Sequence, residues 1–119
     1  MAEPMTMRVL LVEDEPLIAM MLEDFLEALD KGHAGTADCV AAALPMVAAG
    51  GIDAAILDVN LRSGEKSFAI ADALAERGIP FVFATGGGGE EIAPEHRDRP
   101  RLSKPFTMDG VDQALAQLA

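Results

Sequence analysis

The sequence is poor in the residues that build disulfides and thiolate metal sites. Its 119 residues include one cysteine, Cys39, and no tryptophan or tyrosine. A single cysteine forms no internal disulfide and no Cys-x-x-Cys pair, so nothing in the sequence indicates an oxidising compartment. We therefore expect a cytoplasmic protein.

Positive charge is also scarce. The chain has 9 Lys and Arg residues against 20 Asp and Glu residues, and its formal net charge is −11. A phosphate backbone attracts cationic surfaces and repels a surface of this kind. We therefore expect no nucleic-acid partner and no binding to anionic membranes.

Long apolar runs are absent as well. The longest charge-free stretch, residues 39–52, is rich in Ala and Gly and is shorter than the roughly 20 apolar residues of a membrane-spanning helix. The apolar run at residues 9–12 is too short for the core of a signal peptide. We expect no membrane or export segment, and one domain over residues 1–119 without an output domain, because a domain usually takes roughly 100–200 residues.

Compact apolar runs predict the strands. Residues 7–12, 52–57 and 81–84 are mostly apolar, with Arg8 and Asp53 near the start of the first two runs, and they contain β-branched or aromatic side chains, which is typical of strands buried on both faces. Weaker strand candidates lie at residues 33–37 and 101–103. Each strong run is followed by a polar or turn-forming segment.

Apolar residues at helical spacing predict the helices between these strands. The predicted helices lie at residues 18–29 with Gly32 as the stop, 40–47 with Pro45 inside, 68–75 with Gly78 as the stop, and 111–118. The acidic residues of the first helix are expected to form a solvated face; they are Glu23, Asp24, Glu27 and Asp30.

The segment between the fourth and fifth strands differs from the others. Four glycines occupy residues 86–89, and residues 90–100 contain two prolines and one large apolar side chain. We expect any helix there to be short and poorly anchored. Our hypothesis is that the glycines loosen residues 86–99, which then become ordered when the site next to Thr85 is occupied. His33 and His96 are expected to be ordinary surface residues.

The alternation of strands and helices predicts an α/β fold, a doubly wound, five-stranded parallel sheet with helices on both faces. In such sheets ligands bind just beyond the carboxyl ends of the strands. The residues found there are Glu13, Asp14, Asp58, Thr85 and Lys104. We expect these side chains to share one site.

Three carboxylates in one site repel one another unless a cation lies between them. An all-oxygen set without His or Cys suits a hard cation such as Mg²⁺. A partly filled Mg²⁺ shell beside a Lys and a Thr is the arrangement that phosphoryl transfer needs. A carboxylate in such a site can be the nucleophile and form an aspartyl phosphate.

The same residues carry a family resemblance over nearly the whole chain. The sequence LLVEDEP at residues 10–16, the strands that end at Asp58 and Thr85, and the run SKPF at residues 103–106 resemble the receiver domain of bacterial two-component response regulators. The resemblance implies the flavodoxin-like receiver fold, with Mg²⁺ as cofactor and a sensor histidine kinase or phosphotransfer protein as partner. The downstream target is a protein that the sequence does not identify.

The resemblance also implies a role for each site residue. Asp58 would accept the phosphoryl group, Thr85 would contact a phosphoryl oxygen, and Lys104 would pair with it. The metal would bind to Glu13, Asp14 and Asp58 and to the backbone carbonyl of Asn60. The protein would then modify itself, by phosphorylation and autodephosphorylation, and would not turn over an external substrate.

One departure from the family pattern concerns the aromatic residue that, in receivers, rotates inward together with the Thr on activation. Receivers usually have an aromatic residue two positions before the Lys, and here that residue is Leu102. The sequence FATG at residues 83–86 resembles the FAT-GUY receivers, which lack this aromatic and are often stand-alone domains in stress signalling. The Tyr of their motif is absent too, because glycines follow.

Two other functions are open at this stage, and a third is disfavoured. The chain is alternatively a phosphate sink or phosphorelay intermediate, or a receiver-like binding module that is never phosphorylated. A phosphatase that works through an aspartyl phosphate would need a second Asp two residues after the nucleophile, and Asn60 occupies that position.

Overall fold

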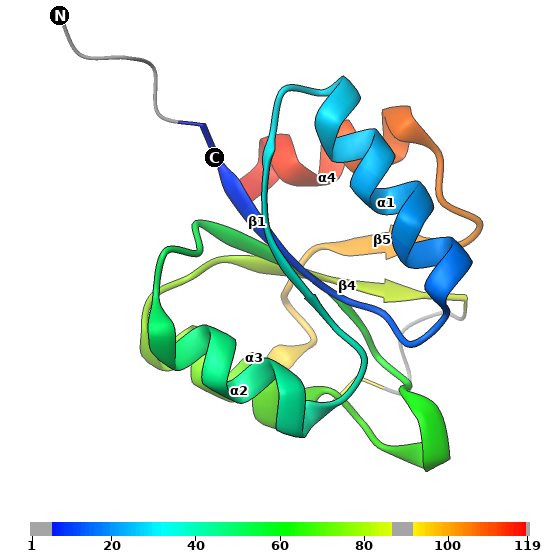
Figure 1. Cartoon of the computed structure of the whole chain (residues 1–119). Helices are drawn as coiled ribbons and strands as arrows, with labels where there is room; N and C mark the ends of the chain where they lie inside the picture. Colours follow the sequence, from blue (N-terminus) through cyan, green and yellow to red (C-terminus); the bar gives the residue numbers. More distant parts are fainter. Residues whose placement is uncertain (1–5, 87–91, 119) are drawn as a thin grey trace, which may run out of the picture.

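The computed structural model describes residues 6–86 and 92–118 and contains one five-stranded sheet (Figure 1). All four strand pairs are parallel, and the strand order is β2-β1-β3-β4-β5. The strands are β1 (Arg8–Val12), β2 (Gly32–Ala37), β3 (Ala54–Asp58), β4 (Phe81–Thr85) and β5 (Arg101–Ser103). The predicted doubly wound parallel sheet is confirmed.

Helices cover both faces of this sheet. They are α1 (Pro16–Ala28), α2 (Val40–Ala49), α3 (Phe68–Glu76) and α4 (Met108–Leu118). Figure 1 shows α1 and α4 on one face and α2 and α3 on the other. Alternate residues of β1 belong to the two cores: Val9 and Leu11 pack with α1 and α4, whereas Leu10 and Val12 pack with α2 and α3. This alternation follows from the two-residue period of a strand.

The central strands are buried along their whole length. All five residues of β3 and all five of β4 are buried. This explains why both sequences read as continuous apolar runs, because a parallel strand covered on both faces has no solvent side. Asp58 and Thr85, the last residues of β3 and β4, are therefore the polar ends of buried strands.

The first helix ends earlier than the sequence predicts. Helix α1 ends at Ala28, and Gly32, the predicted stop, is the first residue of β2. Asp30 makes the turn instead: its φ angle is 60°, and the next N–H, of Lys31, donates to the carbonyl of Leu26 at 2.8 Å. Asp is one of the few non-glycine residues that adopts this left-handed conformation readily.

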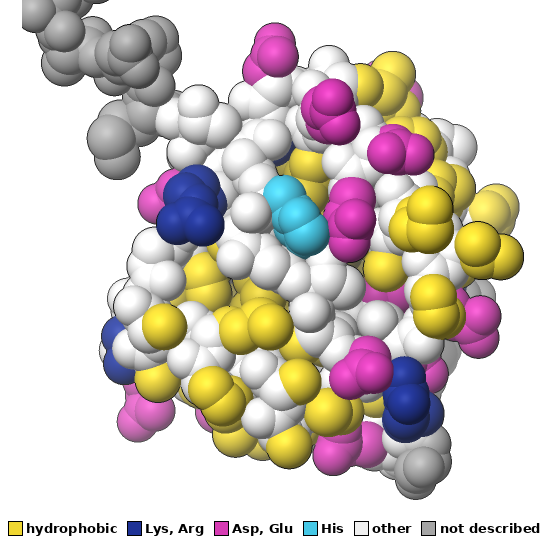
Figure 2. Space-filling view, in the orientation of Figure 1, with side chains coloured by type: hydrophobic (Ala, Val, Ile, Leu, Met, Phe, Trp, Pro, Cys, Tyr) yellow, Lys and Arg dark blue, Asp and Glu magenta, His cyan; other side chains and the backbone are white. Residues whose placement is uncertain are grey.

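The acidic face of α1 agrees with its prediction. Asp24, Glu27 and Asp30 are exposed, and acidic side chains gather on this side of the molecule in Figure 2. Glu23 is half-buried, and its carboxylate accepts a hydrogen bond from the Thr36 hydroxyl at 2.9 Å. His33 is exposed as expected and contacts the same hydroxyl.

The predicted poor anchoring of residues 90–100 is wrong for the described part, residues 92–100. These residues contain only a short 3₁₀ turn (Pro94–His96), as expected, but Ile92 and His96 are 1% and 4% exposed. His96 is therefore not a surface residue. Its ring lies 5.8–6.5 Å from those of Phe68, Phe81 and Phe83, and its Nε2 lies 2.7 Å from an Asp72 oxygen.

The hypothesis that the glycines loosen residues 86–99 falls partly on residues that the structure does not describe. Residues 87–91 are not described, so the glycine hypothesis stays a prediction. Residues 92–99 form no α-helix. Within residues 6–86 and 92–118, no helix is both long enough and apolar enough to cross a bilayer.

Candidate functional site

The carboxyl ends of four strands meet at one edge of the sheet. Asp58 and Thr85 end β3 and β4, while Glu13 and Lys104 directly follow β1 and β5. The strand order reverses at β1, which lies between β2 and β3, and such a switch point leaves a crevice for ligands. The structure thus brings together the residues that the strand-end rule selects.

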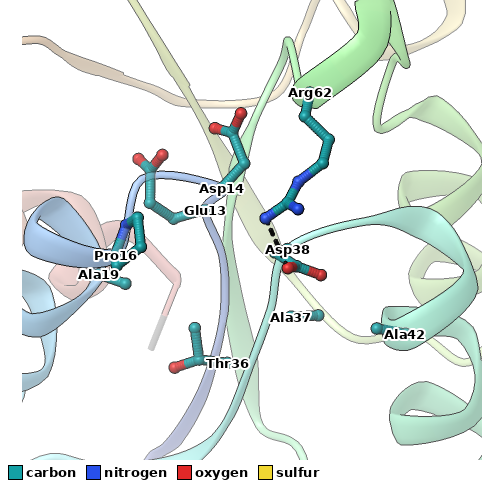
Figure 3. A pocket seen from close by; sticks show the side chains of 9 residues that line it. All are labelled: Glu13, Asp14, Pro16, Ala19, Thr36, Ala37, Asp38, Ala42 and Arg62. Atoms are coloured by element: carbon teal, nitrogen blue, oxygen red, sulfur yellow. Dashed lines mark hydrogen bonds and ion pairs between the residues drawn. The ribbon is translucent and has the colours of Figure 1, made fainter.

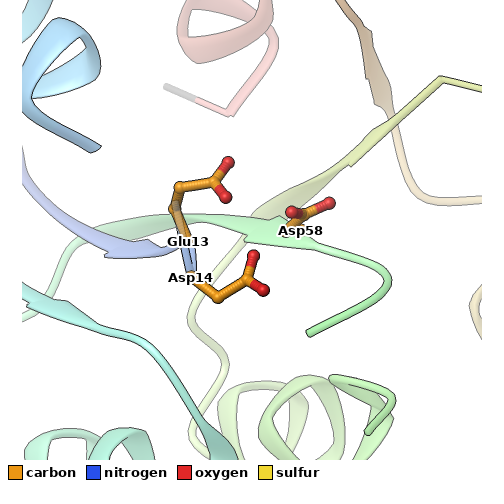
Figure 4. Close-up of side chains that lie close together, drawn as sticks. All are labelled: Glu13, Asp14 and Asp58. Carbon is orange, nitrogen blue, oxygen red and sulfur yellow. The ribbon is translucent and has the colours of Figure 1, made fainter. Parts of the chain in front are cut away.

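Three carboxylates form the centre of this site. Oxygens of Glu13, Asp14 and Asp58 all lie within 4.8 Å of one another, and Figure 4 shows the three side chains converging from the ends of β1 and β3. Glu13 and Asp58 are buried, and Asp14 is half-buried. These three residues can hold a divalent cation.

A lysine pairs with the central carboxylate. The Lys104 Nζ donates a hydrogen bond to Asp58 Oδ1 at 2.9 Å. Burial lowers the pKa of Lys104, but the hydrogen bond and the charge of Asp58 outweigh it, so that the pKa is raised. The ammonium is therefore charged near neutral pH and fixed on the side of Asp58.

The pKa values of Glu13 and Asp58 are both raised, so burial in this site disfavours the charged form of each acid. Burial raises the pKa of Glu13 to about 7, and the charge of Asp58 contributes in the same direction. Burial also raises the pKa of Asp58, against the lowering effect of Lys104. One lysine is too little positive charge for three adjacent carboxylates, and a divalent cation would remove the deficit.

This donor set fits Mg²⁺. It offers only oxygen ligands, the carboxylates are mutually close, and the acids are driven toward the protonated form without a cation. Mg²⁺ takes only a few protein oxygens and keeps several waters, so that some of these ligands act through water. Glu13, Asp14 and Asp58 would hold the ion.

The two other predicted residues lie beside the carboxylates. Thr85 is 5% exposed, and its carbonyl accepts the backbone N–H of Lys104 at 3.2 Å, which ties the ends of β4 and β5 together. Asn60 follows β3, and its side-chain oxygen accepts a hydrogen bond from the Lys66 ammonium. The roles expected for Thr85 and for the Asn60 carbonyl stay predictions.

Leu102 occupies the position where receivers usually have an aromatic ring. It is 5% exposed and lies in β5, packed into the core between the sheet and α1 and α4. Because Leu102 is not aromatic, this position has no ring that could rotate toward Thr85.

Sequence reasoning missed a charged pair at the rim of the site. Arg62 Nη2 lies 2.7 Å from Asp38 Oδ2, and both side chains line a cleft of about 320 Å³ together with Glu13 and Asp14 (Figure 3). Asp38 directly follows β2, so the strand-end rule would have found it had it been applied to the weak second strand.

An apolar hollow beside Lys104 was also missed. It has a volume of about 460 Å³, and its apolar lining comes from Ile18, Met21, Pro105 and Phe106. Glu13, Glu15 and Lys104 also line it. Its parts come from α1 and from the segment after β5, which are distant in sequence, so no local pattern predicts it.

Two solved structures resemble this chain closely. The solution structure of SdrG from Sphingomonas melonis Fr1 is 67% identical, with 95% of this chain and 96% of that chain covered and a TM-score of 0.85. The BeF3-activated conformation of SdrG from Pseudomonas melonis Fr1 is 68% identical, with 93% and 94% covered and a TM-score of 0.81.

A curated relative is longer. The phyllosphere-induced regulator PhyR of Methylorubrum extorquens is 31% identical over 121 residues, which cover 98% of this chain and 45% of PhyR. The chain thus spans about half the length of the curated relative that it matches. No protein-family model matches the sequence.

Proposed function

This chain belongs to the family of response regulator receiver domains, since it is similar to SdrG, to PhyR and, with 31% identity, to the solved REC domain of the response regulator PhyR from Erythrobacter litoralis. We propose that it is an Mg²⁺-dependent phosphoryl acceptor. The group comes from a phosphohistidine of a sensor kinase or phosphotransfer protein, and Asp58 receives it. The phosphorylated chain then changes which protein it binds. This proposal includes action in the cytoplasm, and the FAT-GUY resemblance supports a place in stress signalling.

The observation that supports this function best is the environment of Asp58. Its carboxylate is buried, bonded to Lys104 at 2.9 Å and adjacent to the carboxylates of Glu13 and Asp14. A nucleophile must be held in the orientation from which it attacks, and the transferred phosphoryl group needs positive charge around its oxygens. Both needs are met at this one position.

The transfer is a displacement at phosphorus. A carboxylate oxygen of Asp58 attacks phosphorus and forms a P–O bond. The P–N bond to the donor imidazole breaks, and its electron pair returns to nitrogen. Lys104 stays on the side of Asp58 and neutralises charge on a phosphoryl oxygen. Thr85 donates its hydroxyl hydrogen to another oxygen, which draws the end of β4 toward the site.

A bound Mg²⁺ would supply charge neutralisation and orientation for the phosphoryl oxygens. Glu13, Asp14 and Asp58 would hold it, with the Asn60 carbonyl as a further ligand. No external substrate is turned over, since Asn60 lies where a phosphatase of this chemistry has a second acid. The modification and its hydrolysis are reactions of the chain on itself.

The donor protein docks on the apolar surface beside Lys104. The hollow lined by Ile18, Met21 and Phe106 opens next to the site, and Leu17 and Met20 of α1 are 78% and 58% exposed. Large exposed apolar side chains of this kind mark contact surfaces. A phosphohistidine must come close to Asp58, and a helix seated here would bring it there.

Two alternative functions differ from this proposal in measurable ways. A phosphate sink or relay intermediate would lose its phosphoryl group quickly and would bind no partner in a phosphorylation-dependent manner. A binding module that is never phosphorylated would show no Mg²⁺-dependent response to a phosphoryl analogue. The complete set of Glu13, Asp14, Asp58, Thr85 and Lys104 favours the phosphorylated receiver over the latter.

Transfer from a phosphorylated kinase tests the proposal. The wild-type chain should acquire a label that hydroxylamine removes, as acyl phosphates require, and Asp58→Asn should acquire none. Asp53→Asn is the matched control, because Asp53 precedes the same strand and accepts the backbone N–H of Arg8 at 2.9 Å. Persistent labelling of Asp58→Asn would show that another residue is the acceptor.

A further inference from the structure

The loop that follows Asp58 is fastened to the start of α2 by two side chains. Arg62 lies four residues after Asp58 and contacts Asp38 at 2.7 Å. Glu65 lies three residues further, and its carboxylate accepts the backbone N–H of Val40 at 2.8 Å. Asp38 and Val40 flank Cys39, the N-cap residue of α2.

This loop is closed by its own backbone. The N–H of Leu61 donates to the Glu65 carbonyl at 2.7 Å, and the N–H of Ser67 donates to the Val59 carbonyl at 3.1 Å. The Leu61 side chain is 4% exposed and anchors the middle of the loop. These contacts close residues 59–67 into one loop that carries Asn60, Arg62 and Glu65.

Glu65 accepts the first N–H of helix α2, that of Val40. The N-cap residue of this helix, Cys39, makes no side-chain cap hydrogen bond, and no acidic residue lies in the first turn. The first N–H groups of a helix need acceptors, and a carboxylate there also meets the positive end of the helix dipole. Glu65 supplies both from a different part of the chain.

Arg62 lies between this helix and the acidic site. Its guanidinium pairs with Asp38, but it lines the same cleft as Glu13 and Asp14, and Figure 3 shows it beside Asp14. The side chains of Arg62 and Asp38 are 57% and 50% exposed. An exposed pair is weak and is easily shifted by a nearby charge. A divalent cation among the carboxylates would repel Arg62 and so favour its existing contact with Asp38.

We propose that Arg62 and Glu65 are positioning residues that couple occupancy of the Asp58 site to the first turn of α2. This inference rests on the proposed function, and it assigns to α2 the role of reporting the state of the site. The coupling runs through a closed loop and two side-chain contacts, and it needs no aromatic residue at position 102. By linkage, a tighter first turn of α2 favours the occupied site to the same degree.

Amide exchange measured by NMR on the full chain tests this coupling. The probe is beryllofluoride with Mg²⁺, and the Val59 amide, next to Asp58, reports whether the site binds it. In the wild-type chain, binding should slow exchange of the Val40 amide by about fivefold or more, the lower end of ordinary coupling between sites.

Three variants separate the contact from the general stability of the chain. Glu65→Ala should bind the analogue about fivefold more weakly, and its Val40 amide should not respond. Glu65→Gln keeps an acceptor for Val40 and should recover most of the response, which also guards against failure of α2 to fold. Glu76→Ala removes the same charge from the exposed end of α3 and should behave as the wild type.

The outcomes distinguish this inference from the proposed function. A change at Val59 without slower exchange at Val40 in the wild type, or an undiminished Val40 response in Glu65→Ala, would overturn the coupling alone. Absence of any response at both amides in the wild type would instead refute the proposed function.

Discussion

The buried carboxyl of Glu13 should make the metal-free protein less stable as the pH rises. Burial raises its pKa from 4.5 to about 7. Between these two values the folded chain keeps a proton that the unfolded chain has released. The folded state therefore binds more protons, and the free energy of unfolding falls with rising pH until the loss is complete above about pH 7.

The size of this effect follows from the two pKa values. A difference of one pKa unit between the folded and unfolded states corresponds to about 1.4 kcal/mol, so the pKa shift from 4.5 to about 7 amounts to a loss of about 3 kcal/mol. Asp58 acts in the same direction, because its pKa is raised as well. In a domain of this length, 3 kcal/mol corresponds to roughly 10 °C in Tm.

Glu13→Gln isolates this contribution. Glutamine imitates the protonated acid at every pH, so the metal-free variant should match the wild type near pH 4.5 and exceed it by about 3 kcal/mol at pH 8. Urea unfolding in EDTA at a series of pH values measures the difference. Mg²⁺ should stabilise the wild type at pH 8 and the variant much less, because the variant has lost a ligand.

The control is Glu27→Gln, which removes an acid from the exposed face of α1 and should leave the pH profile of the wild type unchanged. If the metal-free wild type has the same stability at pH 5 and pH 8, or if Glu13→Gln follows its profile in parallel, the account of a carboxylate cluster that needs a cation is wrong.

Three further predictions concern other residues. Lys104→Ala removes the cation that lowers the pKa of Asp58, so this pKa should rise further; a carboxyl-carbon NMR titration that shows no rise would contradict the pairing. His96→Ala should cost about 2–4 kcal/mol, because it empties a buried site among three rings, whereas Asp72→Ala should cost under about 1 kcal/mol, since that carboxylate is 64% exposed; equal losses in urea unfolding would contradict this. Leu17→Glu should slow transfer from the kinase about tenfold, an ordinary loss for one docking residue, and leave transfer from a small phosphoryl donor unchanged; equal slowing of both would place the donor protein elsewhere.

The sheet and the centre of the site could be predicted because both depend on local patterns. Buried parallel strands appear as apolar runs, and side chains directly after such strands must meet at one edge. Asp58 and Lys104 lie 46 residues apart in sequence, yet each follows from a strand of its own. Topology then brings them together without any knowledge of side-chain packing.

The errors arose where long-range packing decides the outcome. The sequence around His96 is polar and rich in proline, and nothing local indicates that three phenylalanines from α3 and β4 surround its ring. Gly32 is the residue most suited to end a helix, but Asp30 adopts the left-handed conformation in its place, and Gly32 is the first residue of β2. The pair of Arg62 and Asp38 joins two loops, so neither residue indicates its partner.

The most direct test of the central claim is the intact mass of the chain after incubation with phosphoramidate and Mg²⁺. The wild-type chain should gain one phosphoryl group, which hydroxylamine removes and whose addition EDTA prevents. Asp58→Asn should gain none, and Asp53→Asn should gain it as the wild type does. A wild-type chain that gains no such adduct, or an Asp58→Asn chain that gains it, would contradict the assignment of Asp58 as a metal-assisted phosphoryl acceptor.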